Sequence, residues 1–152
     1  LVGKAYASIM KGLVFDRVAG IPVAALPLAT AACLETGSPL IYPRMTAKDH
    51  GTGNVIEGAW NAGERILLLD DLITTGKSKI EAADILKDAG LVVTDLVVLL
   101  ERGVQGRQDM ERAGINLRAF AHVSELFSQC RVMGIITPQQ EEEMLRFVQE
   151  ES

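Results

Sequence analysis

The chain has 152 residues, of which 48% are hydrophobic, 23% charged and 5% aromatic; this indicates one globular domain, residues 1–152, and excludes a disordered chain. Its longest apolar run, residues 91–100, contains Asp95 and is shorter than the roughly 18 residues of a membrane span, so we expect no membrane protein. The 15 basic and 20 acidic residues give a net charge of −5, which argues against nonspecific binding of nucleic acid.

Strand-like and helix-like runs alternate along the chain, and this alternation predicts an α/β domain whose parallel strands are joined by helices. In chain order we expect a helix over 1–12, a strand over 15–20, a helix over 24–36, strands over 39–43 and 65–69, a helix over 79–89, a strand over 91–100, a helix over 108–113, a strand over 116–121, a helix over 123–133 and a last helix from 138. The near-continuous apolar run 91–100 predicts a strand that is covered on both faces and lies centrally in the sheet.

Two helix starts and one long connection stand out in this pattern. Ser78-x-x-Glu81 and Thr137-Pro138-x-Gln140 are capping-box sequences, in which the first side chain caps a backbone amide. Residues 44–63 are rich in glycine and poor in apolar side chains, and this stretch is long for a connection inside a compact domain. We therefore expect it to be a functional or mobile loop.

The cysteines and the amino end bear on cellular context. Cys33 and Cys130 lie in apolar helix-like runs, and the sequence holds neither a CxxC motif nor a histidine cluster. This favours free thiols in a reducing cytoplasm over a disulfide framework or a zinc site. The chain begins at Leu1 inside a helix-like run without a cleavable leader pattern, so we expect it to be cut from something longer.

The strongest chemical feature is a pair of carboxylates followed by a hydroxyl-rich turn. Asp70 and Asp71 end a buried strand-like run, and Thr-Thr-Gly-Lys-Ser at 74–78 leads into a helix. Backbone amides at such a turn, together with the helix dipole, favour a phosphate. The carboxylates can accept hydrogen bonds from sugar hydroxyls or act through Mg²⁺. We predict a sugar-phosphate site here; the alternative is an acidic strand end followed by an ordinary turn.

This block resembles the phosphoribosyl pyrophosphate signature of the type I phosphoribosyltransferases. The resemblance implies their fold, a twisted parallel sheet flanked by helices. It also implies that Asp70 and Asp71 bind the ribose hydroxyls of the donor and that the turn binds its 5′-phosphate. The residues assigned to the turn are Thr74, Thr75, Gly76, Lys77 and Ser78.

Three further segments, 18–29, 42–51 and 100–102, resemble the orotate phosphoribosyltransferase family in particular, so that the resemblance covers essentially the whole chain. It implies transfer of a phosphoribosyl group from phosphoribosyl pyrophosphate to orotate. The products would be orotidine 5′-phosphate and pyrophosphate, in the biosynthesis of UMP. Mg²⁺ would be the cofactor, held through the donor with Asp70 and Asp71 as candidate ligands, and no covalent nucleophile would be needed.

The resemblance also assigns roles to the remaining segments. Loop 44–58 would be a catalytic loop that acts in the partner subunit of a homodimer, with Arg44, Lys48 and His50 on the pyrophosphate. Cations there would stabilise the charge that builds on the leaving group. Arg102 would contact the base. The pyrophosphate-side loop would present backbone groups of Ala19, Gly20, Ile21 and Val23.

The sequence departs from the family in four places, and alternatives follow. Gly-Val-Gln-Gly at 103–106 follows Arg102, where Glu-Gln-Gly-Gly is usual. Met45 and Val23 stand where lysine and tyrosine are usual, and the residues that form a hood over the base have no counterpart in residues 1–152. Arg44, Lys48, His50 and Arg102 could instead be solvated surface side chains. A transferase for a neutral purine or uracil and a donor-binding module without turnover therefore stay open.

Overall fold

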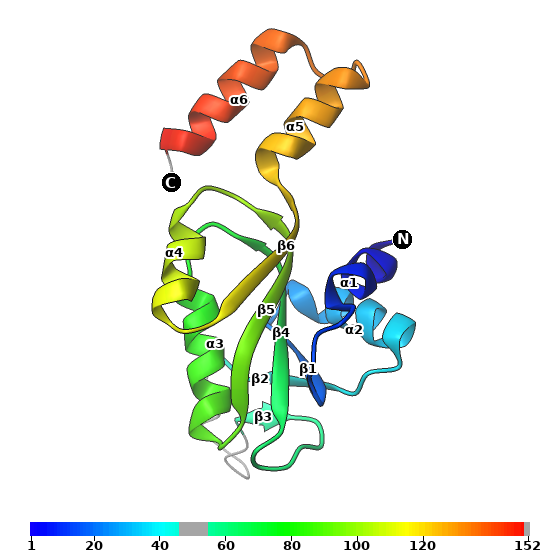
Figure 1. Cartoon of the computed structure of the whole chain (residues 1–152), viewed down its shortest axis with the longest axis vertical. Coiled ribbons are helices and arrows are strands. Elements are labelled where there is room, and N and C mark those ends of the chain that lie inside the picture. The colour runs from blue at the N-terminus through cyan, green and yellow to red at the C-terminus, as the bar shows by residue number, and fades with distance from the viewer. Residues whose placement is uncertain (46–54, 151–152) are drawn as a thin grey trace.

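The computed structural model describes residues 1–45 and 55–150, and within them the strands form one six-stranded sheet (Figure 1). Its order is β3-β2-β1-β4-β5-β6. All neighbouring strands pair in parallel except β2 and β3, which pair antiparallel. The strands are β1 Arg17–Gly20, β2 Leu40–Pro43, β3 Ile56–Glu57, β4 Arg65–Ile73, β5 Val92–Glu101 and β6 Asn116–His122. The predicted α/β class with a parallel sheet is confirmed, and β3 is a short antiparallel addition inside the predicted loop.

Helices cover both faces of the sheet. Figure 1 shows α1 (Val2–Met10) and α2 (Ala25–Thr36) on one face and α3 (Lys77–Asp88) and α4 (Gln105–Arg112) on the other. Strand β4 contributes side chains to the hydrophobic clusters on both faces of the sheet, because alternate side chains of a strand point to opposite faces. Its Leu67 and Leu69 pack in the cluster that holds Tyr6 and Ala29, whereas Ile66 and Leu68 pack in the cluster that holds Ala82 and Leu86.

Strand β5 differs from its predicted place in one respect. Its side chains at Leu96, Val97 and Val98 are fully buried, which confirms that it is covered on both faces. It lies between β4 and β6, however, so the two middle positions of the sheet belong to β1 and β4.

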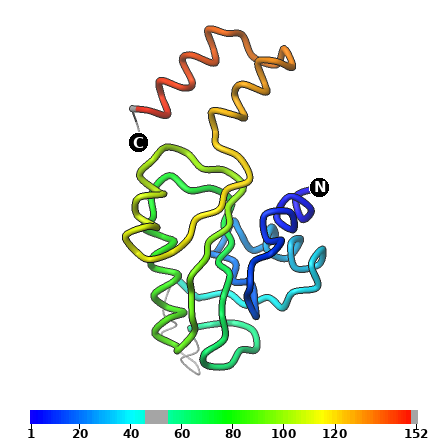
Figure 2. The backbone as a smooth tube through the Cα atoms, viewed as in Figure 1, coloured from blue at the N-terminus to red at the C-terminus, as the bar shows by residue number. Residues whose placement is uncertain are grey.

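Helices α5 (Val123–Val132) and α6 (Pro138–Glu150) form a hairpin that extends beyond the sheet, as the backbone trace in Figure 2 shows. The predicted capping box at its second helix is confirmed. The amide of Gln140 donates to Oγ1 of Thr137 over 3.2 Å, and the amide of Thr137 donates to Oε1 of Gln140 over 2.8 Å. Among the described helices, none combines the length and the apolar composition that crossing a bilayer requires.

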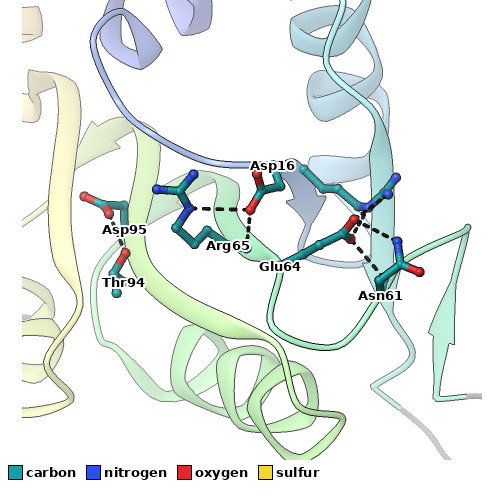
Figure 3. Close-up of polar contacts among 7 residues, drawn as sticks. Asp16, Asn61, Glu64, Arg65, Thr94 and Asp95 are labelled. Atoms are coloured by element: carbon teal, nitrogen blue, oxygen red, sulfur yellow. Dashed lines mark hydrogen bonds and ion pairs between the residues drawn. The ribbon is translucent and has the colours of Figure 1, made fainter.

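The amino ends of the parallel strands are held by a polar network (Figure 3). Glu64, just before β4, accepts hydrogen bonds from Arg17 at the start of β1 and from Asn61. The neighbouring Arg65 donates its backbone amide to Oδ2 of Asp16 over 2.8 Å. Hydrogen bonds from Arg17 and then from Asn61 lower the pKa of Glu64 to about 2. The network therefore fixes β1 against β4 at the end of the sheet opposite to the predicted site.

We expect Glu64→Gln to lower the midpoint of thermal unfolding at pH 7. Because the pKa of Glu64 is depressed in the folded state, its ionic contribution is present above its ordinary pKa of 4.5 and is lost as the pH falls toward 2. The difference between variant and parent should therefore shrink from pH 5 to pH 2 when thermal unfolding is followed by circular dichroism. Glu81→Gln, on the exposed side of α3, is the control, and a Glu64→Gln difference that is constant across this range would contradict the assignment.

Candidate functional site

The predicted site segments leave the sheet at one edge, in a fixed order. Strands β2, β1, β4 and β5 are neighbours and parallel, so their carboxyl ends lie side by side. Arg44 follows β2, residues 21–23 follow β1, residues 74–78 follow β4 and Arg102 follows β5. Ligands of open α/β sheets bind outside this edge. Segments far apart in sequence thus form one candidate site.

The two carboxylates at the end of β4 lie in different environments. Asp70 is 5% exposed, and its Oδ2 lies 2.7 Å from Nζ of Lys79, which is itself 8% exposed. Its Oδ1 accepts a hydrogen bond of 2.9 Å from the backbone amide of Asp71. Burial raises the pKa of the Asp70 carboxyl above its ordinary value, and Lys79 opposes this shift. Asp71 is half-buried, and its Oδ1 accepts the amide of Leu72 over 2.7 Å.

A fully buried tyrosine connects this strand end to the opposite face of the sheet. The hydroxyl of Tyr6, on α1, donates to the backbone oxygen of Asp70 over 2.8 Å. Burial, followed by the charges of Asp70 and Asp71, raises the pKa of the phenol. Asp70 is therefore held by its backbone from one face and by its side chain, through Lys79, from the other.

The turn at 74–78 lies at the start of α3, as predicted, but its cap differs. The helix begins at Lys77 with Gly76 as the N-cap, and no side chain caps this end. The predicted capping box at Ser78 is therefore wrong, because Ser78 is already the second residue of the helix. Thr75, Lys77 and Ser78 are exposed, so these residues lie at the surface of this edge.

Helix α4 supports the turn from behind. The amide of Gly76 donates to Oδ2 of Asp109 over 2.9 Å, and this bond, with a further one from Gln105, lowers the pKa of Asp109. A Cβ at Gly76 would lie 2.5 Å from Cβ of Asp109, so only glycine allows this approach. Gly106 is in equally close contact, since a Cβ there would lie 2.6 Å from Cγ1 of Ile73. The turn is thus packed on α4 and pre-formed.

On the pyrophosphate side, the structure brings part of the predicted loop together with Arg44. A cavity of about 580 Å³ is lined by Val23, Arg44 and Met45, among others. Ala19 and Gly20 lie within β1, and the amide of Ile21 donates to the backbone oxygen of Leu69 over 3.0 Å. Of the four predicted loop residues, Val23 therefore reaches the cavity, and it is the exposed one.

The cations of the predicted catalytic loop are only partly described. Arg44 forms an ion pair with Glu57 of β3, and its backbone amide donates to the oxygen of Val55 over 2.8 Å. Lys48 and His50 lie outside the described residues. Met45, where the family usually has lysine, packs against the apolar core.

Arg102 occupies the far end of the edge. Its backbone amide donates to the oxygen of Ile73 over 2.8 Å, which places it beside the turn that follows β4. Its guanidinium carbon lies over the ring of Phe147 on α6, 5.5 Å from the ring centroid. The preceding residue, Glu101, is buried and accepts a hydrogen bond of 2.7 Å from Nε of Arg107.

Sequence reasoning missed several residues that shape this edge. Lys79 lies in the first turn of the helix that follows Asp70 and Asp71. This closeness in sequence is the one signal that could have indicated an ion pair with Asp70. Asp109 and Phe147 come from α4 and α6, and nothing in their local sequence points to the turn or to Arg102. Their roles depend on how these helices pack.

Asp70 and Asp71 are the candidate ligands for a divalent cation at this edge. Among the described residues, no group of three or more His, Cys, Asp or Glu side chains could hold a metal ion by itself. Mg²⁺ commonly takes one or two carboxylates and completes its shell with substrate phosphates and water. Asp71, with Asp70 behind it, fits that mode of binding, whereas Asp70 is already paired with Lys79.

We expect Lys79→Met to lower the free energy of unfolding by about 3 kcal/mol, because it leaves the buried Asp70 carboxylate without its partner. Lys77→Met, in the same helix turn but exposed, is the control and should change stability by less than about 0.5 kcal/mol. In urea unfolding, Asp70→Asn should cost less in the Lys79→Met background than in the parent. Additive effects would show that the two side chains do not interact.

Comparison with known proteins identifies the family of the chain. No family model matches the chain. The orotate phosphoribosyltransferase of Pyrococcus furiosus is 43% identical over 122 residues, which cover 80% of this chain and 67% of that protein. The bifunctional enzyme PyrF/PyrE of Nostoc sp. is 40% identical over 135 residues, or 89% of this chain and 28% of that protein.

The solved structure of Leishmania donovani UMP synthase matches with a TM-score of 0.88 and 38% identity, over 97% of this chain and 32% of that one. The chain therefore spans between 28% and 67% of the length of these three relatives. Sequence identity over most of the chain and a shared fold lead to one conclusion. The chain belongs to the orotate phosphoribosyltransferase family.

Proposed function

We propose that this chain transfers the phosphoribosyl group of phosphoribosyl pyrophosphate to orotate, giving orotidine 5′-phosphate and pyrophosphate in the biosynthesis of UMP. The observation that carries the proposal is the order of the four segments along the sheet edge. That order runs from Arg44 and Val23 through Asp71 and the turn to Arg102. It matches the order of the chemical parts along the reacting pair: pyrophosphate, ribose 5-phosphate and base.

The 5′-phosphate lies on the turn in this proposal. Residues 74–78 offer hydroxyls at the start of α3, where the helix dipole favours an anion, and backbone amides other than that of Gly76, which donates to Asp109. Lys77, exposed at the first helical position, adds a cation. Because α4 packs closely against Gly76, the turn keeps its shape without the ligand. Little conformational entropy of the turn is therefore lost on binding.

The ribose is oriented by the two carboxylates. Asp71 presents its half-buried carboxylate to the sugar hydroxyls, and Asp70 is held behind it by its contact with Lys79. Mg²⁺, when bound with the donor, neutralises part of the pyrophosphate charge. Fixing the sugar relative to the base supplies the positional part of catalysis.

Departure of pyrophosphate builds negative charge at the β1 and β2 end of the site. Arg44 lies there, and Lys48 and His50 follow it in the chain. Cations held near the leaving group stabilise the transition state more than the ground state. Glu57 forms an ion pair with the Arg44 guanidinium, so binding of the donor by Arg44 includes exchange of this partner for phosphate oxygens.

The acceptor is recognised by Arg102. A guanidinium fork matches a carboxylate in two parallel hydrogen bonds, and orotate differs from neutral bases in carrying one. Arg102 also lies directly beside the turn that holds the donor, through its bond to Ile73. This favours orotate over a purine or uracil.

Two further parts of the proposal rest on the family resemblance. The chain acts as a homodimer in which loop 44–58 reaches the partner subunit's site. It works in the cytoplasm, and the free thiols of Cys33 and Cys130 are compatible with that reducing compartment.

The alternative is a module that binds the donor without turnover. The pairing of Arg44 with Glu57 and the apolar contact of Met45 favour it, because both reduce the positive charge offered to pyrophosphate. Turnover separates this alternative from the main proposal.

The test is isothermal titration of the chain with phosphoribosyl pyrophosphate in Mg²⁺, then with orotate, followed by product detection with both. Asp71→Asn should weaken donor binding by about tenfold or more, since a hydrogen bond to a charged group is lost. Asp84→Asn, exposed on α3, should leave it unchanged. Donor binding without product would support the regulatory alternative, and a folded chain that binds no donor would refute the site.

A further inference from the structure

Helix α6 returns from the tip of the hairpin toward the carboxyl edge of the sheet (Figure 2). Its last turns reach Arg102: the guanidinium carbon lies 5.5 Å from the centroid of the Phe147 ring, and Val148 beside it is 7% exposed. A residue near the carboxyl end of the described chain thus contacts the cation that the proposed function assigns to the base.

A cavity of about 430 Å³ lies at this contact. Its lining includes Arg102 after β5, Phe127 of α5, and Glu143, Met144 and Phe147 of α6. Most of the wall is apolar, two of its side chains are aromatic, and it carries one cation and one carboxylate. Such a lining suits a flat ring that has an anionic edge for the guanidinium and an N–H group for the carboxylate.

The Phe147 ring and an acceptor can use Arg102 together. A stacked ring contacts the face of a guanidinium, whereas hydrogen bonds to a carboxylate leave from its edge. Stacking also restricts the rotamers of a long side chain, so that less entropy is lost when the acceptor binds. Phe147 is 54% exposed, and much of its ring is open to a ligand.

We propose that α6 forms a wall of the acceptor pocket and that Phe147 is a specificity-determining residue, which fixes the Arg102 guanidinium and offers a ring face to a planar, anionic heteroaromatic acceptor. This inference rests on the proposed function and deepens it. Because the wall comes from the hairpin, the acceptor pocket is built from both the sheet edge and a helix outside it.

The test is steady-state kinetics of Phe147→Leu, which keeps apolar volume but removes the ring. The KM for orotate should rise about five- to tenfold, which is the range of a cation–π contact, while the KM for phosphoribosyl pyrophosphate stays within about twofold. Phe120→Leu is the matched control, since Phe120 is 57% exposed on β6. Phe147→Trp should restore the orotate KM.

Each other outcome overturns the inference. An unchanged orotate KM would show that the ring does not serve the acceptor, and a lowered one would show that Phe147 covers Arg102. A rise in both KM values, or the same rise in Phe120→Leu, would show a general loss of structure. The parent chain separates this inference from the proposed function. If the parent makes no product, the affinity for orotate is compared between the parent and Phe147→Leu by titration. A parent that binds no orotate refutes both the inference and the proposed function.

Discussion

The parallel pairing of β4 with β1 on one side and β5 on the other is the constraint on which the candidate site depends. It aligns Ile73 with Glu101, so that β4 and β5 end level with each other, and it aligns Gly20 with Leu69, so that β1 ends four residues earlier, next to Asp70. A shift of one residue in either pairing would turn every side chain of the shifted strand to the other face. The positions of Asp71 and Arg102 relative to the turn therefore follow from sheet register, and the polar network around Glu64 holds that register at the opposite end.

Buried charge is concentrated at the functional edge. Asp70 and Lys79 form a pair that is nearly excluded from water, whereas the ion pairs at the amino end are partly exposed. A buried pair adds little net stability, because desolvation offsets most of its attraction, but loss of one partner is costly. Its role is thus better explained as holding a carboxylate in a fixed orientation behind Asp71 than as a source of stability.

Much of the fold could be predicted because its determinants are local. The alternation of strand-like and helix-like runs, the two-sided burial of 91–100 and the capping box at Thr137 all depend on short-range pattern, and the structure confirms them. The cap at Ser78 was predicted wrongly because the amide of Gly76 donates to Asp109 of a distant helix, and α3 begins at Lys77, two residues before the predicted start at 79. Lys79 and Phe147 could not be assigned in advance for the same reason, since their partners are set by packing between elements. The roles of Lys48 and His50 stay predictions.

The most direct test of this account is a crystal structure of the chain with phosphoribosyl pyrophosphate and Mg²⁺. The account predicts the 5′-phosphate on the hydroxyls of residues 74–78 and on their amides other than that of Gly76, the ribose hydroxyls at Asp71 and the pyrophosphate beside Val23 and Arg44. It would be contradicted by a donor bound elsewhere, for example in the cavity between α4 and β6 that Arg107 and Arg118 line, with the edge formed by β2, β1, β4 and β5 left empty.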